Sequence, residues 1–254
     1  VDQLRERWGA RPSVDRADPD LTLFVHLVRD VATVYLDLSG ESLHRRGYRA
    51  QAMEAPLKES LAAAILRLAG WDRERPFLDP MCGSGTIAIE AALWARRIAP
   101  GLLRERFGFE RWACHDEAQQ RGMADLREAA FARILPAKTP IFGGDIDPAA
   151  IAVATENARV AGVKVTFRHQ SVSAIAPLSP PGMVVTNPPY GERLAGSDEL
   201  YAAMAKALLA LGGHRIAILA GSPAIARAFA HDAARSLAVY NGDLECRLLI
   251  VAPG

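Results

Sequence analysis

From Pro76 onward, short apolar runs alternate with alanine-rich stretches, and this alternation constrains the fold more than any other feature of the chain. The apolar runs have the length of buried strands, and the stretches between them have the composition and periodicity of helices. Strands that alternate with helices favour a mostly parallel sheet with helices on both faces. The predicted strands occupy residues 76–79, 140–146, 165–170, 182–187 and 215–221.

The two ends of the chain depart from this alternation. Residues 236–252 contain two β-rich runs around Asn-Gly-Asp at 241–243, which indicates a hairpin. A C-terminal antiparallel hairpin on a parallel sheet is typical of Rossmann-like methyltransferases. We therefore predict an α/β class I methyltransferase fold with a mostly parallel, seven-stranded sheet. Residues 21–38 predict another hairpin, and the long stretch 100–139 is expected to be an insertion over the sheet.

Composition excludes several classes of protein. Half of the 254 residues are hydrophobic, so the chain can bury a sizeable core, but no apolar run of about 18 residues predicts a membrane span. Cys82, Cys114 and Cys246 are far apart, which argues against a metal site and fits a reducing cytoplasm. The net charge is only +1, so any RNA-binding surface must be a local patch or lie outside this chain. The first residue is Val1, and we expect the chain to be a piece of a longer protein.

A glycine-rich turn follows the first predicted strand of the alternating part. In FLDPMCGSGT (77–86), Asp79 ends the strand, and Gly83 and Gly85 allow the close backbone approach that a ligand needs. Ligands of doubly wound sheets bind at this edge. The segment lacks GxxxxGK[ST], so it is no P-loop; an ordinary tight turn is the alternative. Cys82 has no evident base and suits burial better than nucleophilic chemistry.

A second acidic position follows the next predicted strand. In GGDIDP (143–148), Asp145 stands where a carboxylate accepts hydrogen bonds from ribose hydroxyls in dinucleotide-binding folds. Asp147 and Pro148 have the sequence of a helix start, because Asp is a good N-cap and Pro a good first helical residue. A cofactor contact by Asp147 is the alternative.

The segment VVTNPPYGERL (184–194) decides the chemistry. Asn187, Pro188, Pro189 and Tyr190 directly follow a strand. The Asn187 side-chain oxygen and the Pro188 carbonyl can both accept from one planar NH₂ group, and the Tyr190 ring can stack on a base. Such acceptors stabilise the positive charge that grows on an aromatic amine during methyl transfer. The motif predicts methylation of an exocyclic amine on a base turned out of its stack, whereas NPPY in isolation could be a proline-rich turn.

Together these motifs resemble the THUMP-associated RNA guanine-N2 methyltransferases, and most closely the RlmL-like type that modifies bacterial 23S rRNA. The resemblance implies S-adenosylmethionine as methyl donor, rRNA as partner and no metal. It also implies that residues 1–45 are the C-terminal remnant of a THUMP-type RNA-binding domain plus a linker, and that residues 46–254 are the methyltransferase domain. The similar segments are DLSGESLHRRGYR, PLKESLAAAIL, LDPMCGSGTIAIEAA, APGLLRERFGFERW, HDEA, TNPPYGERL and NGDLECR.

The resemblance places the cofactor on the glycine loop, on the second acid and at the end of the third strand. The family usually has an acid there to recognise adenine, whereas HQSV puts Ser171 at that place, and its hydroxyl or the Val172 amide is expected to serve instead. Lys58 and Glu59 either approach the cofactor or lie on a surface helix. The implied cofactor-binding residues are Asp79, Cys82, Gly83, Ser84, Gly85, Thr86, Asp145, Ile146, Ser171, Val172 and Asn187.

Candidate RNA contacts lie in two places. A dense basic-aromatic cluster precedes the first helix, and phosphate contact is predicted for it, with a solvated linker as the alternative. The cluster consists of Arg45, Arg46, Tyr48 and Arg49. Arg193 either reaches a substrate phosphate or pairs with Glu192. His115 and Asp116 form a polar cluster or contact the substrate.

Other functions stay open at this point. The NPPY motif fits any planar amine, so a tRNA guanine-N2 or an adenine-N6 methyltransferase is the nearest alternative. The intact CGSGT and NPPY strings argue against a non-catalytic RNA-binding module. The lack of GxGxxG and the C-terminal hairpin argue against a dinucleotide oxidoreductase.

Overall fold

The computed structural model describes residues 2–10, 13–15, 17–49, 57–190, 197–229 and 232–252. The chain divides into two compact units, each of which contains its own sheet. The hairpin unit comprises Val1–Leu43 and Glu105–Leu126, and the sheet unit comprises His44–Arg104 and Arg127–Gly254.

A seven-stranded sheet, counted over the described residues, organises the sheet unit in the order β5-β4-β3-β6-β7-β9-β8. β3 to β7 are parallel, and β9 pairs antiparallel with both β7 and β8. This topology confirms the predicted fold class. The strands are β3 (Phe77–Asp79), β4 (Ile141–Asp145), β5 (Thr166–His169), β6 (Met183–Thr186), β7 (Arg215–Ala220), β8 (Ala233–Asn241) and β9 (Leu244–Val251).

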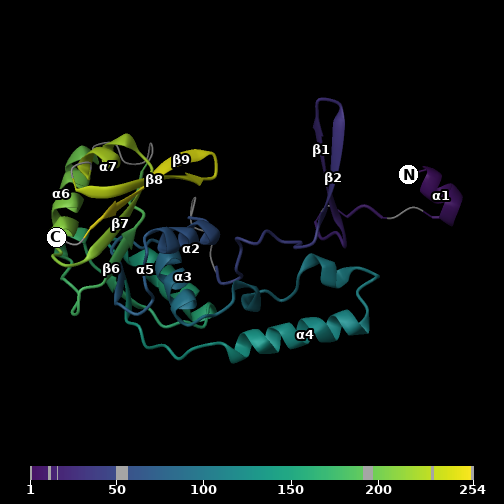
Figure 1. Ribbon diagram of the computed structural model, residues 1–254, viewed down its shortest axis with the longest axis horizontal. Helices are drawn as coiled ribbons and strands as arrows, with labels where there is room; N and C mark the ends of the chain where they lie inside the picture. The colour runs from purple at the N-terminus through teal and green to yellow at the C-terminus, as the bar shows by residue number, and fades with distance from the viewer. Residues whose placement is uncertain are drawn as a thin grey trace. The chain divides into compact units, whose positions relative to one another are not determined.

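Helices cover both faces of this sheet, as Figure 1 shows. α2, α3 and α5 pack against one face, and α6 and α7 pack against the other. Alternate residues of a strand face opposite sides, so Phe77 belongs to the first core and Leu78 to the second. The helical elements are α2 (Glu59–Leu68), α3 (Thr86–Ala95), η1 (Pro100–Leu103), α5 (Pro148–Val160), η3 (Val172–Ala174), α6 (Ser197–Leu209) and α7 (Pro223–Ala228).

Parallel pairing aligns the strand ends, and this alignment positions the site. Asp79 at the end of β3 pairs with Gly143 of β4, and Asp145 at the end of β4 pairs with His169 of β5. The loops that follow β3, β4, β5 and β6 therefore meet at one edge of the sheet, where ligands of such folds bind. The loops that precede these strands lie at the opposite edge.

A two-stranded hairpin is the main element of the hairpin unit. β1 (Thr22–Val28) pairs antiparallel with β2 (Val31–Asp37), as predicted. Arg29 and Asp30 form the turn with φ of 47° and 62°, the left-handed conformation that two-residue hairpin turns require. The remaining elements are α1 (Asp2–Trp8), η2 (Gly108–Arg111) and α4 (Glu117–Ala132), whose last turns belong to the sheet unit.

The predicted insertion is divided between the two units. Residues 105–126 cluster with residues 1–43, and the flanking residues 100–104 and 127–139 belong to the sheet unit. Gly108 explains part of this packing, because its amide donates to the Ser39 carbonyl at 3.0 Å and a Cβ on it would stand 2.7 Å from the Gly40 nitrogen. The backbones of these two segments therefore approach more closely than side chains would allow.

Candidate active site

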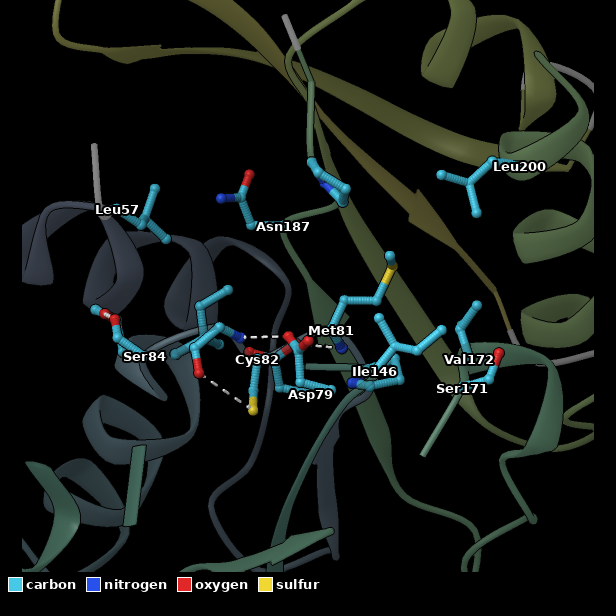
Figure 2. Close-up of a pocket in the computed structure, with 16 residues that line it drawn as sticks. Leu57, Asp79, Met81, Cys82, Ser84, Ile146, Ser171, Val172, Asn187 and Leu200 are labelled. Carbon is cyan, nitrogen blue, oxygen red and sulfur yellow. Dashed lines mark hydrogen bonds between the residues drawn. The ribbon is translucent and has the colours of Figure 1, made fainter. Parts of the chain in front are cut away.

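A pocket of about 380 Å³ opens at the carboxyl edge of the sheet. Loops after β3, β4, β5 and β6 line it, together with Leu57, two residues before α2, and the first turn of α6. Figure 2 shows Leu57 and Asn187 along one border, with Asp79, Cys82 and Ser84 along the other. The lining residues are Leu57, Asp79, Pro80, Met81, Cys82, Gly83, Ser84, Thr86, Ile87, Asp145, Ile146, Ser171, Val172, Asn187, Pro189 and Leu200.

Hydrogen bonds tie the glycine loop to the loop after β4. The Gly83 amide donates to Asp145 Oδ2 at 2.8 Å, and the Cys82 amide donates to the Gly144 carbonyl at 2.8 Å. Asp145 Oδ1 accepts the Asp147 amide at 3.0 Å, and Asp147 caps α5 by accepting the Ala149 amide, as predicted. Each oxygen of Asp145 retains acceptor capacity for a ligand hydroxyl.

The two predicted glycines have different environments. Apart from its chain neighbours, no atom of the described residues lies within 4 Å of a Cβ built on Gly83, whose φ is +51°, so this backbone is open to the pocket. Gly85, with φ +83°, does not line the pocket. A Cβ on Gly85 would stand 3.0 Å from the Ala154 Cβ and the Phe167 ring. Gly85 thus allows close packing of α3 against α5 and β5, which differs from the predicted cofactor contact.

Asp79 lies at the base of the pocket and is only 1% exposed. Burial raises the pKa of Asp79 to about 7, while the Thr186 hydroxyl and the Met81 amide act in the opposite direction. The Asp145 carboxylate adds to the increase. Cys82 is buried, as the sequence suggested, and this burial raises the pKa of its thiol.

Asn187 brings an unsatisfied acceptor to the pocket. Its Oδ1 atom is buried and has no hydrogen-bond partner among the described residues. Buried polar oxygens in proteins are rarely left without a donor, so this one points to a ligand donor. Pro189 also lines the pocket, whereas Pro188 is buried outside the lining.

Tyr190 lies outside the pocket lining and is held by two residues that the sequence did not single out. Its ring lies against Gly221, since a Cβ there would stand 2.5 Å from the ring atoms. Asn241, at the end of β8, donates from Nδ2 to the Tyr190 hydroxyl at 2.9 Å. The C-terminal hairpin therefore fixes the orientation of this aromatic ring.

Three of the four residues in the basic-aromatic cluster face buried partners, and RNA contact by this cluster stays a prediction. Tyr48 is 1% exposed and donates to Glu90 Oε1 at 3.3 Å. Arg46 pairs with the same carboxylate at 3.5 Å. Arg49 pairs with a buried acid at 2.9 Å, which is Glu59. These side chains turn inward because buried carboxylates require compensating charge. The fourth, Arg45, is exposed.

This buried network reaches the pocket wall. Arg49 donates from Nη2 to the Leu57 carbonyl and, at 3.4 Å, to the Thr86 hydroxyl, and both residues line the pocket. Burial raises the pKa of Glu90 to about 7, and the Arg46 guanidinium opposes that increase. The sequence did carry a signal for Glu90, because it is the one acid in the otherwise apolar helix TIAIEAALWA.

The remaining candidates divide as follows. Glu59 is buried and pairs with Arg49, so it is not a surface residue, whereas Lys58 is exposed. In the hairpin unit, Asp116 caps the following turn through the Gln119 amide at 2.9 Å, which supports the polar-cluster interpretation. Arg193 lies outside the described residues.

Within the described part of the chain, no group of acids, His and Cys could hold a metal, and no helix is long and apolar enough to cross a membrane.

A mixed sheet that ends in an antiparallel pair, with a ligand pocket over the ends of its central parallel strands, defines a class I methyltransferase. Residues 46–250 match the family model of the RMKL-like methyltransferase domain, and the chain belongs to this family. It is thus a methyltransferase domain, as predicted. Residues 1–37 match the model of the THUMP domain.

Curated relatives are considerably longer than this chain. The proteins named Ribosomal RNA large subunit methyltransferase K/L from Syntrophotalea carbinolica and Allochromatium vinosum are each 45% identical to it over 98% of its length. The chain covers 37% and 36% of these two relatives, so it spans just over a third of their length.

Solved structures extend the similarity to nearly the whole chain. The structure of SMU.472 in complex with S-adenosylhomocysteine (SAH) is 33% identical, with a TM-score of 0.86 over 99% of this chain and 67% of that one. A Listeria monocytogenes protein, described as a predicted N6-adenine-specific DNA methylase, is also 33% identical, with a TM-score of 0.84 over 100% of this chain and 66% of that one.

Proposed function

We propose that this chain transfers a methyl group from S-adenosylmethionine to the exocyclic N2 amine of a guanine in 23S rRNA. The unsatisfied Asn187 oxygen in a pocket formed by the glycine loop is the observation that carries this proposal. The two large-subunit rRNA methyltransferases that share 45% identity support RNA of the large subunit as the substrate class.

The pocket suits the donor. Its volume of about 380 Å³ falls in the range of small-molecule sites, and the Gly83 backbone is open to it. Asp145 offers carboxylate oxygens to hydroxyl groups, Ile146 offers an exposed apolar side chain to a flat ring, and Ser171 and Val172 complete that end. Bound there, the donor supplies a methyl group activated by a sulfonium.

The residues at the end of β6 act on the acceptor base. Asn187 Oδ1 accepts from the amine and stabilises the positive charge that develops on its nitrogen. Tyr190 presents a ring that Gly221 and Asn241 hold in place, so it can stack on a base without first being ordered. Orientation of the two reactants contributes the rest of the acceleration, and no strong base is needed.

The domain assignment belongs to the same proposal. We infer that residues 1–45 belong to a THUMP-type RNA-binding region and that residues 46–254 form the methyltransferase domain, with 105–126 contributing to the first region instead. The THUMP match to residues 1–37 and the clustering of 105–126 with 1–43 support this assignment. A substrate on the ribosome also supports a cytoplasmic location.

Adenine N6 is the second candidate acceptor. The similarity to the Listeria protein, a predicted N6-adenine-specific DNA methylase, favours it, and the Asn187 side-chain oxygen can accept from either amine. The two acceptors give different products, N2-methylguanosine and N6-methyladenosine, so one nucleoside analysis separates them.

The test uses this chain, labelled methyl donor and bacterial large-subunit rRNA without its natural modifications. We expect N2-methylguanosine at one position, and a loss of at least about 100-fold in rate for Asn187→Ala. SAH titration by calorimetry should show near wild-type affinity for this variant and weak affinity for Asp145→Ala. N6-methyladenosine as the product would transfer the assignment to the second candidate.

Absence of SAH binding by the wild-type chain would overturn the cofactor assignment. SAH binding without methylation of any RNA would overturn the acceptor assignment alone. These two results distinguish an error in the pocket from an error in the substrate.

A further inference from the structure

A second cavity lies at the edge of the sheet opposite the candidate active site. Its volume is about 400 Å³. Loops that precede β3, β4 and β5 form its walls together with the last turn of α3. The floor is apolar and includes Ala92, Ala95 and Ile141.

The lining of this cavity is strongly basic. Arg73, Arg96, Lys138 and Lys164 line it with a single acid, Glu74, although the whole chain has a net charge of only +1. Arg73, Lys138 and Lys164 form no ion pair with any residue in the described part of the chain. Their charges are therefore available to an anionic ligand.

Two of the cations are held in fixed positions. Arg96 donates from Nε to the Leu135 carbonyl at 3.1 Å and from Nη1 to the Gly162 carbonyl at 2.8 Å. A guanidinium has five N–H donors, so donors remain for a ligand. Arg73 lies over the Trp94 ring at 5.5 Å, and its carbonyl accepts the Thr139 hydroxyl at 2.6 Å.

We propose that this cavity binds backbone phosphates of the RNA substrate, an inference that rests on the proposed function. Lys and Arg side chains that neutralise phosphates supply most of the sequence-independent affinity for nucleic acids. In the predicted cluster near residue 48, Arg46 and Arg49 pair with Glu90 and Glu59, so acids of the chain itself compensate their charges. The apolar floor can accept a ribose or base beside the phosphates.

The distance from the active site suits a single RNA strand. Helix α3 begins at the cofactor pocket with Thr86 and ends at the basic cavity with Ala95. Its ten residues rise about 15 Å, a distance that a few nucleotides can cover. One strand could therefore contact the cavity while another part of the same RNA enters the active site.

The test compares two variants that lose the same charge. Lys138→Gln/Lys164→Gln removes two cations from the cavity, and Lys206→Gln/Arg235→Gln removes two exposed cations from α6 and β8. Binding of a labelled single-stranded RNA of about 20 nucleotides is measured by fluorescence anisotropy, with SAH present. At about 0.1 M salt we expect a loss of about 20-fold for the cavity variant and less than about threefold for the control. The slope of log affinity against log salt should fall in magnitude by about 1.4 for the cavity variant.

Three results would overturn the proposal: no RNA binding by the wild-type chain at low salt, equal losses in the two variants, or displacement of the RNA by low millimolar phosphate or guanosine monophosphate. The last would identify a small phosphorylated ligand as the occupant.

Different results count against the phosphate site and against the proposed function. Cavity-dependent RNA binding without methylation counts against the function only, and methylation with unchanged affinity in the cavity variant counts against the site only.

Discussion

At the scale of single residues, two glycines in the same loop have different roles, one in ligand binding and the other in folding. Gly83 opens onto the pocket, whereas Gly85 packs against Ala154 and Phe167. We expect Gly85→Ala to destabilise the chain by roughly 2–4 kcal/mol, because both its φ and the neighbouring atoms oppose a Cβ. Gly83→Ala should destabilise by only about 1 kcal/mol but weaken SAH binding strongly. Urea unfolding of both variants measures their stability, and calorimetry measures their affinity for SAH. If the two variants had the same stability and lost the same affinity for SAH, the separate roles of the two glycines would be contradicted.

Asp79 makes stability depend on pH in a direction opposite to that of an ordinary ion-paired acid. Its pKa rises to about 7 in the folded chain, so between about pH 4 and pH 7 the folded state binds more protons than the unfolded state. The contribution of Asp79 to stability is therefore complete below pH 4 and is lost as the pH rises through 7. We expect Asp79→Asn to become more stable relative to the wild type from pH 5 to pH 8, by about 3 kcal/mol at most. A difference in unfolding free energy that stays constant across this range would refute the assignment.

Asn241 is expected to act through Tyr190. Loss of its hydrogen bond in Asn241→Ala frees the ring, so methyl transfer should slow about tenfold or more while SAH affinity stays unchanged. Asp243→Ala, an exposed change in the same hairpin turn, is the matched control. Equal rates in the two variants would show that the ring needs no such support.

At the scale of elements, the sequence predicted the strands and hairpins that hydrophobic periodicity and turn residues specify. The strands from β3 to β7 and both hairpins follow from apolar runs that turn residues separate. The contacts of the Arg46–Arg49 segment could not be predicted this way. An arginine beside a glycine has the same local pattern whether it faces solvent or a buried carboxylate elsewhere in the chain.

The Arg49–Glu59 pair joins the residue at position 49 to the first turn of α2. Glu59 is 2% exposed, so removal of its partner leaves an uncompensated buried charge. We expect Arg49→Ala to lower the free energy of unfolding by about 2–4 kcal/mol, less than for a fully buried pair because Arg49 is partly exposed. It should also weaken SAH binding, since Arg49 holds the Leu57 carbonyl at the pocket. Arg45→Ala, at an exposed position, should change neither quantity, and a similar loss there would contradict the assigned role of the pair.

At the scale of the whole molecule, the two units differ in how their apolar residues are used. The sheet unit buries two cores, one on each face of its sheet. The β1–β2 hairpin leaves large apolar side chains exposed, among them Val25 at 66%, Leu27 at 69% and Val34 at 63%. The length of the curated relatives shows how much sequence such proteins have beyond a chain of this size. The sequence predicted the hairpin but not the exposure of its apolar side chains, because their burial depends on contacts with residues outside the two strands.

This difference predicts unequal protection of backbone amides in the two units. A two-stranded hairpin with both faces exposed is marginally stable, whereas strands buried on both faces open only with global unfolding. In hydrogen–deuterium exchange we expect the amides of β1 and β2 to exchange within seconds to minutes, and those of β6 and β7 to persist for hours under the same conditions. Val25→Lys, on the exposed hairpin, should leave the exchange of β6 and β7 and the affinity for SAH unchanged. Slow exchange throughout the hairpin would mean that its apolar face is covered in solution, and dilution would then show whether a second copy of the chain provides that cover.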